Sequence, residues 1–113
     1  MGDGIMASFT ASTKALDCAK DIQRSFAEYN QVASEPLHVT IGIAAGEPVQ
    51  DGGDLFGATV QLASRLCELA KGGEILASET VRTTSSTPGI LKERSAIPLK
   101  GFARSVPTFE CPW

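Results

Sequence analysis

The spacing of apolar residues changes repeatedly along this chain, and the order of the changes limits the folds that the chain can adopt. Residues 5 to 9 alternate with the two-residue period of a strand. Apolar residues between 15 and 29 recur every three or four positions, which predicts an amphipathic helix of about four turns. Residues 38 to 43 return to the strand period. The chain is therefore expected to begin as strand, helix and strand.

The predicted first helix has an apolar and a polar side. Its apolar stripe contains Ala15, Ala19, Ile22, Phe26 and Tyr29. Its polar side contains Lys14, Asp17, Lys20, Asp21 and Arg24. Ser12 or Thr13 precedes the stripe and is the expected N-cap, because a hydroxyl can accept a backbone N–H of the first turn.

The middle of the chain predicts a second helix that ends at glycine. The segment from 46 to 57 is rich in glycine and acidic residues, so we expect a loop or a short hairpin there. The helix then begins near Ala58 and carries a broad apolar stripe. Lys71-Gly72-Gly73 supplies a basic last turn and a glycine stop. Residues 74 to 77 follow as a short strand.

The last third predicts a polar segment and two closing strands. Residues 81 to 88 contain a run of Ser and Thr and are expected to be mobile. Residues 91 to 99 and 106 to 111 are expected to form strands around the Lys100-Gly101 turn. The whole order predicts an α+β fold, a ferredoxin-like sandwich with helices packed on one face of a mainly antiparallel sheet.

Length and charge exclude several classes of protein. A chain of 113 residues with 42% apolar content suits one domain over residues 1–113. The net charge of −3 does not support a nucleic-acid or membrane partner. No apolar run approaches the roughly 20 residues that cross a bilayer, and no secretion signal is present, so we expect a cytoplasmic protein. Cys18, Cys67 and Cys111 lack metal-ligand spacing and are expected to be reduced, partly buried thiols.

Several polar residues are candidates for chemistry, although each also has a structural explanation. Asp3 stands between two glycines and, taken alone, is more typical of a turn than of a metal site. Gln61 and Arg65 are one helical turn apart, where Arg65 can simply pair with Glu68. Lys100 can equally be an exposed lysine of a turn.

Taken together and in this order, these residues resemble the later part of a class III nucleotidyl cyclase catalytic domain. The matching segments are Gly2-Asp3-Gly4, Asp54-Leu55-Phe56-Gly57, Val60-Gln61-Leu62-Ala63-Ser64-Arg65-Leu66 and Leu99-Lys100-Gly101. Residues 42 to 49 also resemble the family's central strand and the turn after it. The resemblance implies the family's fold and the conversion of ATP to cyclic AMP and pyrophosphate.

The resemblance also implies a role for each residue. Asp3 matches one of two aspartates that hold two divalent metal ions, so Mg²⁺ or Mn²⁺ is the implied cofactor. Arg65 matches the arginine that contacts the transition-state phosphate, and Gln61 replaces an asparagine that contacts the ribose. Asp54 matches the position that reads adenine. Lys100 matches the lysine that holds the terminal phosphates.

The chain begins at Met1, directly before the segment that matches the second metal-binding aspartate of the family. We therefore expect the front of the family's domain, including its first metal-binding aspartate and a central strand, to be absent. Unpaired backbone groups of an incomplete sheet are adhesive, so we expect a homodimer or a segment-exchanged oligomer.

Three functions are compatible with these residues. The first is an adenylyl cyclase-like domain that is weak or inactive as an isolated chain. The alternative is a non-catalytic cyclase-like module that dimerises or binds nucleotide. A ferredoxin-like ligand-binding domain with coincidental motifs is a third possibility.

Overall fold

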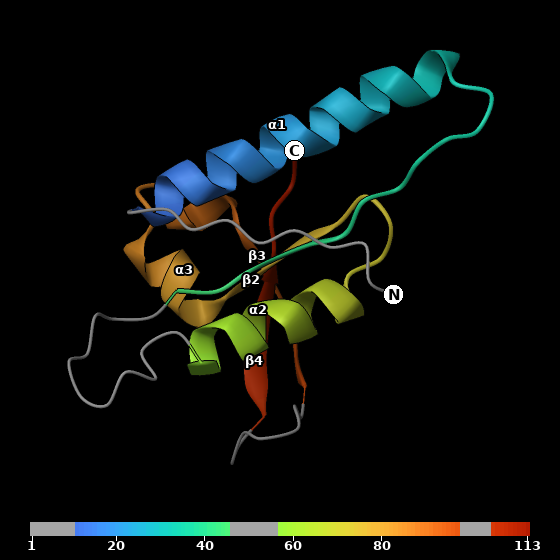
Figure 1. Cartoon of the computed structure of the whole chain (residues 1–113). Helices are drawn as coiled ribbons and strands as arrows, with labels where there is room; N and C mark the ends of the chain where they lie inside the picture. Colours follow the sequence, from blue (N-terminus) through green and yellow to red (C-terminus); the bar gives the residue numbers. More distant parts are fainter. Residues whose placement is uncertain (1–10, 46–56, 98–104) are drawn as a thin grey trace.

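A computed structural model describes residues 11–45, 57–97 and 105–113 of the chain, and Figure 1 shows their arrangement. In chain order the elements are α1 (Ser12–Val32), β1 (Ile41–Ile43), α2 (Gly57–Leu69), β2 (Ile75–Ser78), α3 (Glu79–Thr84), the 3₁₀ helix η1 (Pro88–Ile90), β3 (Lys92–Ile97) and β4 (Val106–Glu110). The predicted strand at 5–9, nearly all of the loop predicted at 46–57, and the Lys100-Gly101 turn lie outside the described residues.

The described strands form one sheet in the order β1-β2-β4-β3. β1 runs parallel to β2, with Ile41 opposite Ile75. β4 is antiparallel to both of its neighbours, with Phe109 opposite Ala77 on one side and Glu93 on the other. The sheet is mainly antiparallel and carries packed helices, which confirms the predicted α+β class.

Helices cover both faces of the sheet, so the expectation that they lie on one face is wrong (Figure 1). One core cluster packs α1 and α3 against Ile75 and Ala77 of β2. The second core cluster packs Leu66 of α2 against Leu76, which lies between Ile75 and Ala77 in β2. Because side chains alternate across a strand, all four residues of β2 are buried between two layers. The sequence of β2 is a short apolar run, and such a run does not show whether helices cover one face of the strand or both.

α1 confirms the predicted first helix, but the predicted N-cap is wrong. Ala11 occupies the N-cap position, and no side chain makes a capping hydrogen bond. The two hydroxyls expected there point instead toward the end of α3. Ser12 Oγ lies 2.6 Å from Thr84 Oγ1, and Thr13 Oγ1 accepts the backbone N–H of Ser86 at 2.8 Å. These hydroxyls therefore join α1 to α3 and to the residues that follow α3.

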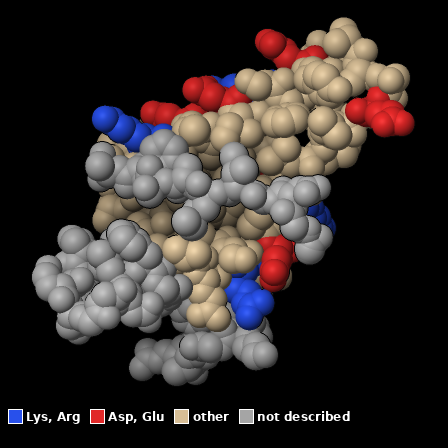
Figure 2. Space-filling model, in the orientation of Figure 1, with Lys and Arg blue, Asp and Glu red and all other residues tan. Residues whose placement is uncertain are grey.

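The buried side of α1 is only partly the predicted apolar stripe. The buried residues are Leu16, Ala19 and Gln23. Tyr29, predicted to belong to the stripe, is 49% exposed. Gln23 is accommodated in the core because its side-chain amide donates to the carbonyls of Val39 and Glu74. Figure 2 shows charged side chains along the outer surface of the molecule over α1, in agreement with the predicted polar side.

The segment predicted to be polar and mobile, residues 81 to 88, begins inside a helix: its first four residues belong to α3, and Pro88 begins η1. Ser78 accepts the backbone N–H of Val81 at 3.4 Å and caps α3. Val81 is 0% exposed and belongs to the larger core cluster. One apolar residue in a Ser/Thr-rich run thus anchors α3 to the core.

The second helix, the glycines that follow it and the short strands are confirmed, but the predicted basic last turn is wrong, because Lys71 lies beyond the end of α2. α2 ends at Leu69, and Gly73 has a φ of +86°, which glycine adopts without the steric cost of a Cβ. The Gly73 N–H donates to the Val39 carbonyl at 2.8 Å, which guides the chain into β2. None of the helices in the described ranges is both long enough and apolar enough to cross a membrane.

All three cysteines are free, as predicted. Cys18 and Cys67 are partly buried, whereas Cys111 is buried in the larger core cluster. Burial raises the pKa of the Cys111 thiol, so the thiol stays protonated near neutral pH.

Candidate functional site

Gln61 and Arg65 lie on the same side of α2, one helical turn apart, next to the side that packs on the sheet. Leu66 on the packed side is 0% exposed, and Ala70, directly after the helix, is 8% exposed in the same core cluster. Gln61 is exposed, and the side chain of Arg65 is 33% exposed. Both polar side chains therefore stand at the margin of a packed core, which holds the backbone beneath them in place.

Arg65 carries a hydrogen-bond donor that no described residue uses. Its Nη1 lies 3.5 Å from Oε1 of Glu68, whose side chain is 65% exposed. Its Nε is buried and has no hydrogen-bond partner among the described residues. A buried N–H without a partner is costly, and a phosphate or carboxylate oxygen can satisfy it once the side chain turns Nε toward solvent. The planar guanidinium suits such an anion because it can donate two parallel hydrogen bonds.

The described part of the chain contains two of the five predicted site residues, Gln61 and Arg65, and brings them together. Asp3, Asp54 and Lys100 lie outside the described residues, so their positions relative to Arg65 stay predictions. Within the ranges 11–45, 57–97 and 105–113, no three His, Cys, Asp or Glu side chains gather where they could hold a metal ion. The described residues by themselves do not form a Mg²⁺ or Mn²⁺ site.

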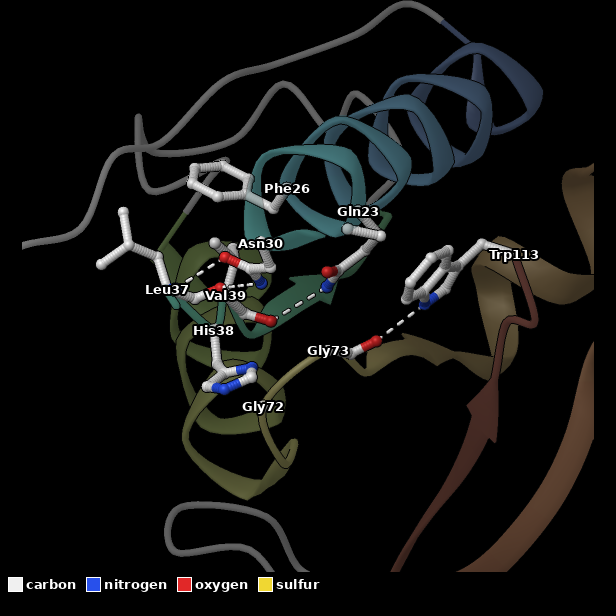
Figure 3. A pocket seen from close by; sticks show the side chains of 10 residues that line it. Gln23, Phe26, Asn30, Leu37, His38, Val39, Gly72, Gly73 and Trp113 are labelled. Atoms are coloured by element: carbon white, nitrogen blue, oxygen red, sulfur yellow. Dashed lines mark hydrogen bonds between the residues drawn. The ribbon is translucent and has the colours of Figure 1, made fainter. Parts of the chain in front are cut away.

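A separate pocket of about 270 Å³ lies between the C-terminal half of α1 and Trp113 (Figure 3). Asn30 donates to and accepts from the backbone of Leu37, and the Trp113 indole N–H donates to the Gly73 carbonyl at 2.7 Å. These polar groups already have partners, so they offer little to a ligand. Arg65 does not line this pocket, which is distinct from the exposed side of α2.

One polar residue of this pocket, His38, does not lie where the sequence pattern predicts it. The pattern predicts His38 in a strand, but β1 begins at Ile41 and His38 is an exposed residue of the preceding segment. Gln23 lines the pocket from the buried side of α1. The sequence signal for Gln23 is its position four residues after Ala19, where the helix repeat places a side chain on the buried side.

Comparison with known proteins identifies a family for nearly the whole chain. The family model of the adenylate and guanylate cyclase catalytic domain matches residues 2–109. Among solved structures, an adenylate/guanylate cyclase/hydrolase from Silicibacter pomeroyi is 27% identical in sequence and superposes with a TM-score of 0.80. That match covers 99% of this chain and 69% of the other.

Two curated relatives extend the comparison. A Rhizobium meliloti (strain 1021) protein provisionally named adenylate cyclase 3 is 29% identical over 82 residues, which are 71% of this chain and 14% of that protein. An uncharacterized protein of Mycobacterium tuberculosis (strain ATCC 25618 / H37Rv) is 36% identical over 78 residues, which are 68% of this chain and 25% of that protein. The chain therefore spans at most a quarter of the length of these relatives.

Proposed function

The chain belongs to the adenylate and guanylate cyclase catalytic domain family, and from this premise we propose that it forms part of an adenylyl cyclase. In the proposed reaction, the ribose 3′-oxygen of ATP attacks the α-phosphorus. The new bond closes cyclic AMP as the bond to pyrophosphate breaks. The observation that carries the proposal is Arg65 on α2, whose buried Nε–H has no partner among the described residues.

Arg65 is assigned to the α-phosphate. Its guanidinium donates hydrogen bonds to oxygens on which negative charge builds in the transition state. Glu68 holds one end of the guanidinium when no nucleotide is bound. An ion pair this exposed contributes less than about 1 kcal/mol, so a phosphate can replace it at little cost.

The other assignments follow the family resemblance. Gln61, one turn before Arg65, orients the ribose. Asp54 accepts a hydrogen bond from the exocyclic amine of adenine, and this choice favours ATP over GTP. Lys100 holds the terminal phosphates through the compact charge of its ammonium group.

The proposal includes Mg²⁺ or Mn²⁺, with Asp3 as a ligand. When bound, such an ion neutralises charge on phosphate oxygens. Among the described residues, no three His, Cys, Asp or Glu side chains gather where they could hold such an ion. The roles of Arg65 and Gln61 therefore rest on the hydrogen bonds of their own side chains and not on the metal.

The proposal also includes self-association and a cytoplasmic location. Within the described part of the chain, β1 is an edge strand of only three residues. Edge strands pair readily with a strand of another chain, which supports a homodimer or a segment-exchanged oligomer. The cytoplasm is the location in which ATP and reduced thiols such as Cys18 and Cys67 occur together.

A second candidate function is a non-catalytic module that binds nucleotide or dimerises. Gln61 favours this candidate, because its amide is carried on a side chain one methylene longer than the asparagine that the family resemblance implies. The extra methylene displaces the amide from the ribose and weakens the alignment of the attacking oxygen.

The test is formation of cyclic AMP by the purified chain with Mn²⁺ and ATP, beside GTP, in the unchanged protein and in Arg65→Ala. Arg24→Ala is the matched control, because Arg24 forms a comparable i,i+3 pair with Asp21, at 3.9 Å, on α1. We expect a low rate with ATP that survives in Arg24→Ala and disappears in Arg65→Ala.

Two other outcomes discriminate the candidates. ATP binding without product, lost in Arg65→Ala and kept in Arg24→Ala, favours the non-catalytic module. If the chain at high protein concentration forms no product and binds no ATP, this result contradicts both candidates that involve a nucleotide.

A further inference from the structure

Gly42 is the central residue of β1, and its backbone lies directly against α2. A Cβ built on Gly42 would collide with the carbonyl oxygen of Ala63 and would lie 2.5 Å from the amide nitrogen of Cys67. Both atoms belong to the backbone of α2, so neither can rotate away as the end of a side chain can. Any side chain at position 42 must therefore displace α2 or β1.

The neighbouring residues explain why the contact falls on this side of the strand. Ile41 and Ile43 pack against the core cluster on the opposite face, next to α1 and α3. Because successive residues of a strand alternate between faces, Gly42 and Thr40 both lie on the side of α2. The absence of a Cβ at Gly42 thus sets how closely α2 approaches the sheet.

A polar contact joins the same two elements. Thr40 Oγ1 lies 3.2 Å from the sulfur of Cys67, and the Cys67 thiol donates to the Thr40 carbonyl at 3.4 Å. We refer to Thr40, Gly42, Ala63 and Cys67 as the α2–β1 seam. In the seam, the contact at Gly42 prevents α2 from moving closer to the sheet. The hydrogen bonds between Thr40 and Cys67 oppose its movement away from the sheet.

Arg65 lies between Ala63 and Cys67, in the turn of α2 that contacts Gly42. A shift of this turn away from β1 moves the Arg65 backbone with it. Displacement of a reacting or stabilising group by about 1 Å can cost on the order of 100-fold in rate. The distance between α2 and β1 at the seam therefore determines which positions the Arg65 guanidinium can reach.

We propose that Gly42 is a positioning residue for Arg65. It has no side chain, and α2 can therefore pack at the separation from β1 that brings the guanidinium to the α-phosphate. The identity of that phosphate rests on the proposed function, whereas the effect of Gly42 on the position of α2 does not.

The variant that tests the proposal is Gly42→Ala, and Gly89→Ala is its matched control. A Cβ built on Gly89 meets no atom within 4 Å, and neither glycine has a positive φ. Thr40→Val is a milder second variant that removes the hydroxyl contact to Cys67 while keeping the branched shape. Circular dichroism and thermal melts establish which variants fold. If Gly42→Ala does not fold, Thr40→Val tests the proposal in its place.

Two readouts separate the position of α2 from the reaction. The first is kcat and KM for ATP. We expect kcat of Gly42→Ala to fall roughly tenfold or more below that of Gly89→Ala, with KM within about threefold. The second is the alkylation rate of Cys67 in the folded protein, measured by peptide mass spectrometry relative to Cys18 on α1. We expect Gly42→Ala to accelerate alkylation of Cys67 severalfold, because the seam opens.

Thr40→Val is expected to change both readouts in the same direction and by less. A folded Gly42→Ala protein with the kcat and the Cys67 alkylation rate of Gly89→Ala would overturn the proposal. If the unchanged chain and Gly89→Ala neither bind ATP nor form product, the proposed function fails. In that case the alkylation rate of Cys67 still decides whether Gly42 sets the position of α2.

Discussion

The Nη1 atom of Arg65 lies 3.5 Å from Oε1 of Glu68, three residues further along α2. Both side chains are partly exposed, so the pair stabilises the helix by about 0.5 kcal/mol or less. The contact leaves the buried Nε of Arg65 without a partner among the described residues. Glu68 therefore holds one edge of the guanidinium and competes with any anion that approaches Arg65.

Replacing Glu68 tests this competition. Glu68→Gln removes the negative charge beside Arg65, and we expect ATP to bind severalfold more tightly, with a gain that shrinks as salt concentration rises. Isothermal titration calorimetry measures both effects. Asp21→Asn is the matched control, because it removes the carboxylate of a similar pair on α1 and should leave ATP affinity unchanged. Equal ATP affinity in Glu68→Gln and the unchanged chain would contradict the competition.

Glu74 should make the stability of the fold depend on pH. Its carboxylate accepts the backbone N–H of Lys71 at 2.8 Å and lies 3.2 Å from Nη1 of Arg94. The hydrogen bond from Lys71, together with Arg94 and against the opposing effect of burial, lowers the pKa of Glu74 from its ordinary value of 4.5. A lowered pKa in the folded state means that this stability is present above pH 4.5 and is lost as pH falls through the folded-state pKa.

The measurement is the free energy of unfolding by urea at neutral and at acidic pH. Between neutral and acidic pH, we expect the free energy of unfolding to fall less in Glu74→Gln than in the unchanged chain. The difference should be on the order of 1 kcal/mol or less, since the Arg94 pair is partly exposed. Glu35→Gln, an exposed position outside the helices and strands, is the control that keeps the full loss. The same pH dependence in Glu74→Gln as in Glu35→Gln would show that the contacts of Glu74 do not persist in solution.

Leu16 should contribute far more to stability than another apolar residue of the same helix. Leu16 is 2% exposed in the larger core cluster, whereas Val32 at the end of α1 is 87% exposed. We expect Leu16→Ala to lower the free energy of unfolding by about 2 to 5 kcal/mol and Val32→Ala by less than about 0.5 kcal/mol. Urea denaturation compares the two. Similar losses would mean that α1 packs on the sheet with a different side.

Helix α2 illustrates what the sequence could predict about the fold. Its apolar repeat and the glycine stop at Gly73 are local signals, and the helix forms where they place it. The spacing of Gln61 and Arg65 is local in the same way, so the sequence placed both on one side of one helix. Asp3 and Lys100 depend on contacts between distant segments, and their relation to Arg65 stays a prediction.

Features that depend on distant partners were not predictable. α3 forms in a Ser/Thr-rich run because Val81 packs in a core that residues from both halves of the chain build. The sequence pattern also placed the helices on one face of the sheet, whereas β2 is covered on both faces. The part that Gly42 plays becomes visible only where the backbone of α2 lies against it.

The Nε–H group of Arg65 can be observed by NMR while a nucleotide binds. In ¹H–¹⁵N spectra of the purified chain titrated with α,β-methylene-ATP, a non-reacting analogue, the Arg65 Nε–H signal is assigned with Arg65→Lys. The Nε–H signal of Arg24 serves as the internal reference. We predict a saturable shift of the Arg65 signal, with the Arg24 signal unchanged. An Arg65 signal that stays in place while other signals report nucleotide binding would contradict the assignment of Arg65 to the phosphate.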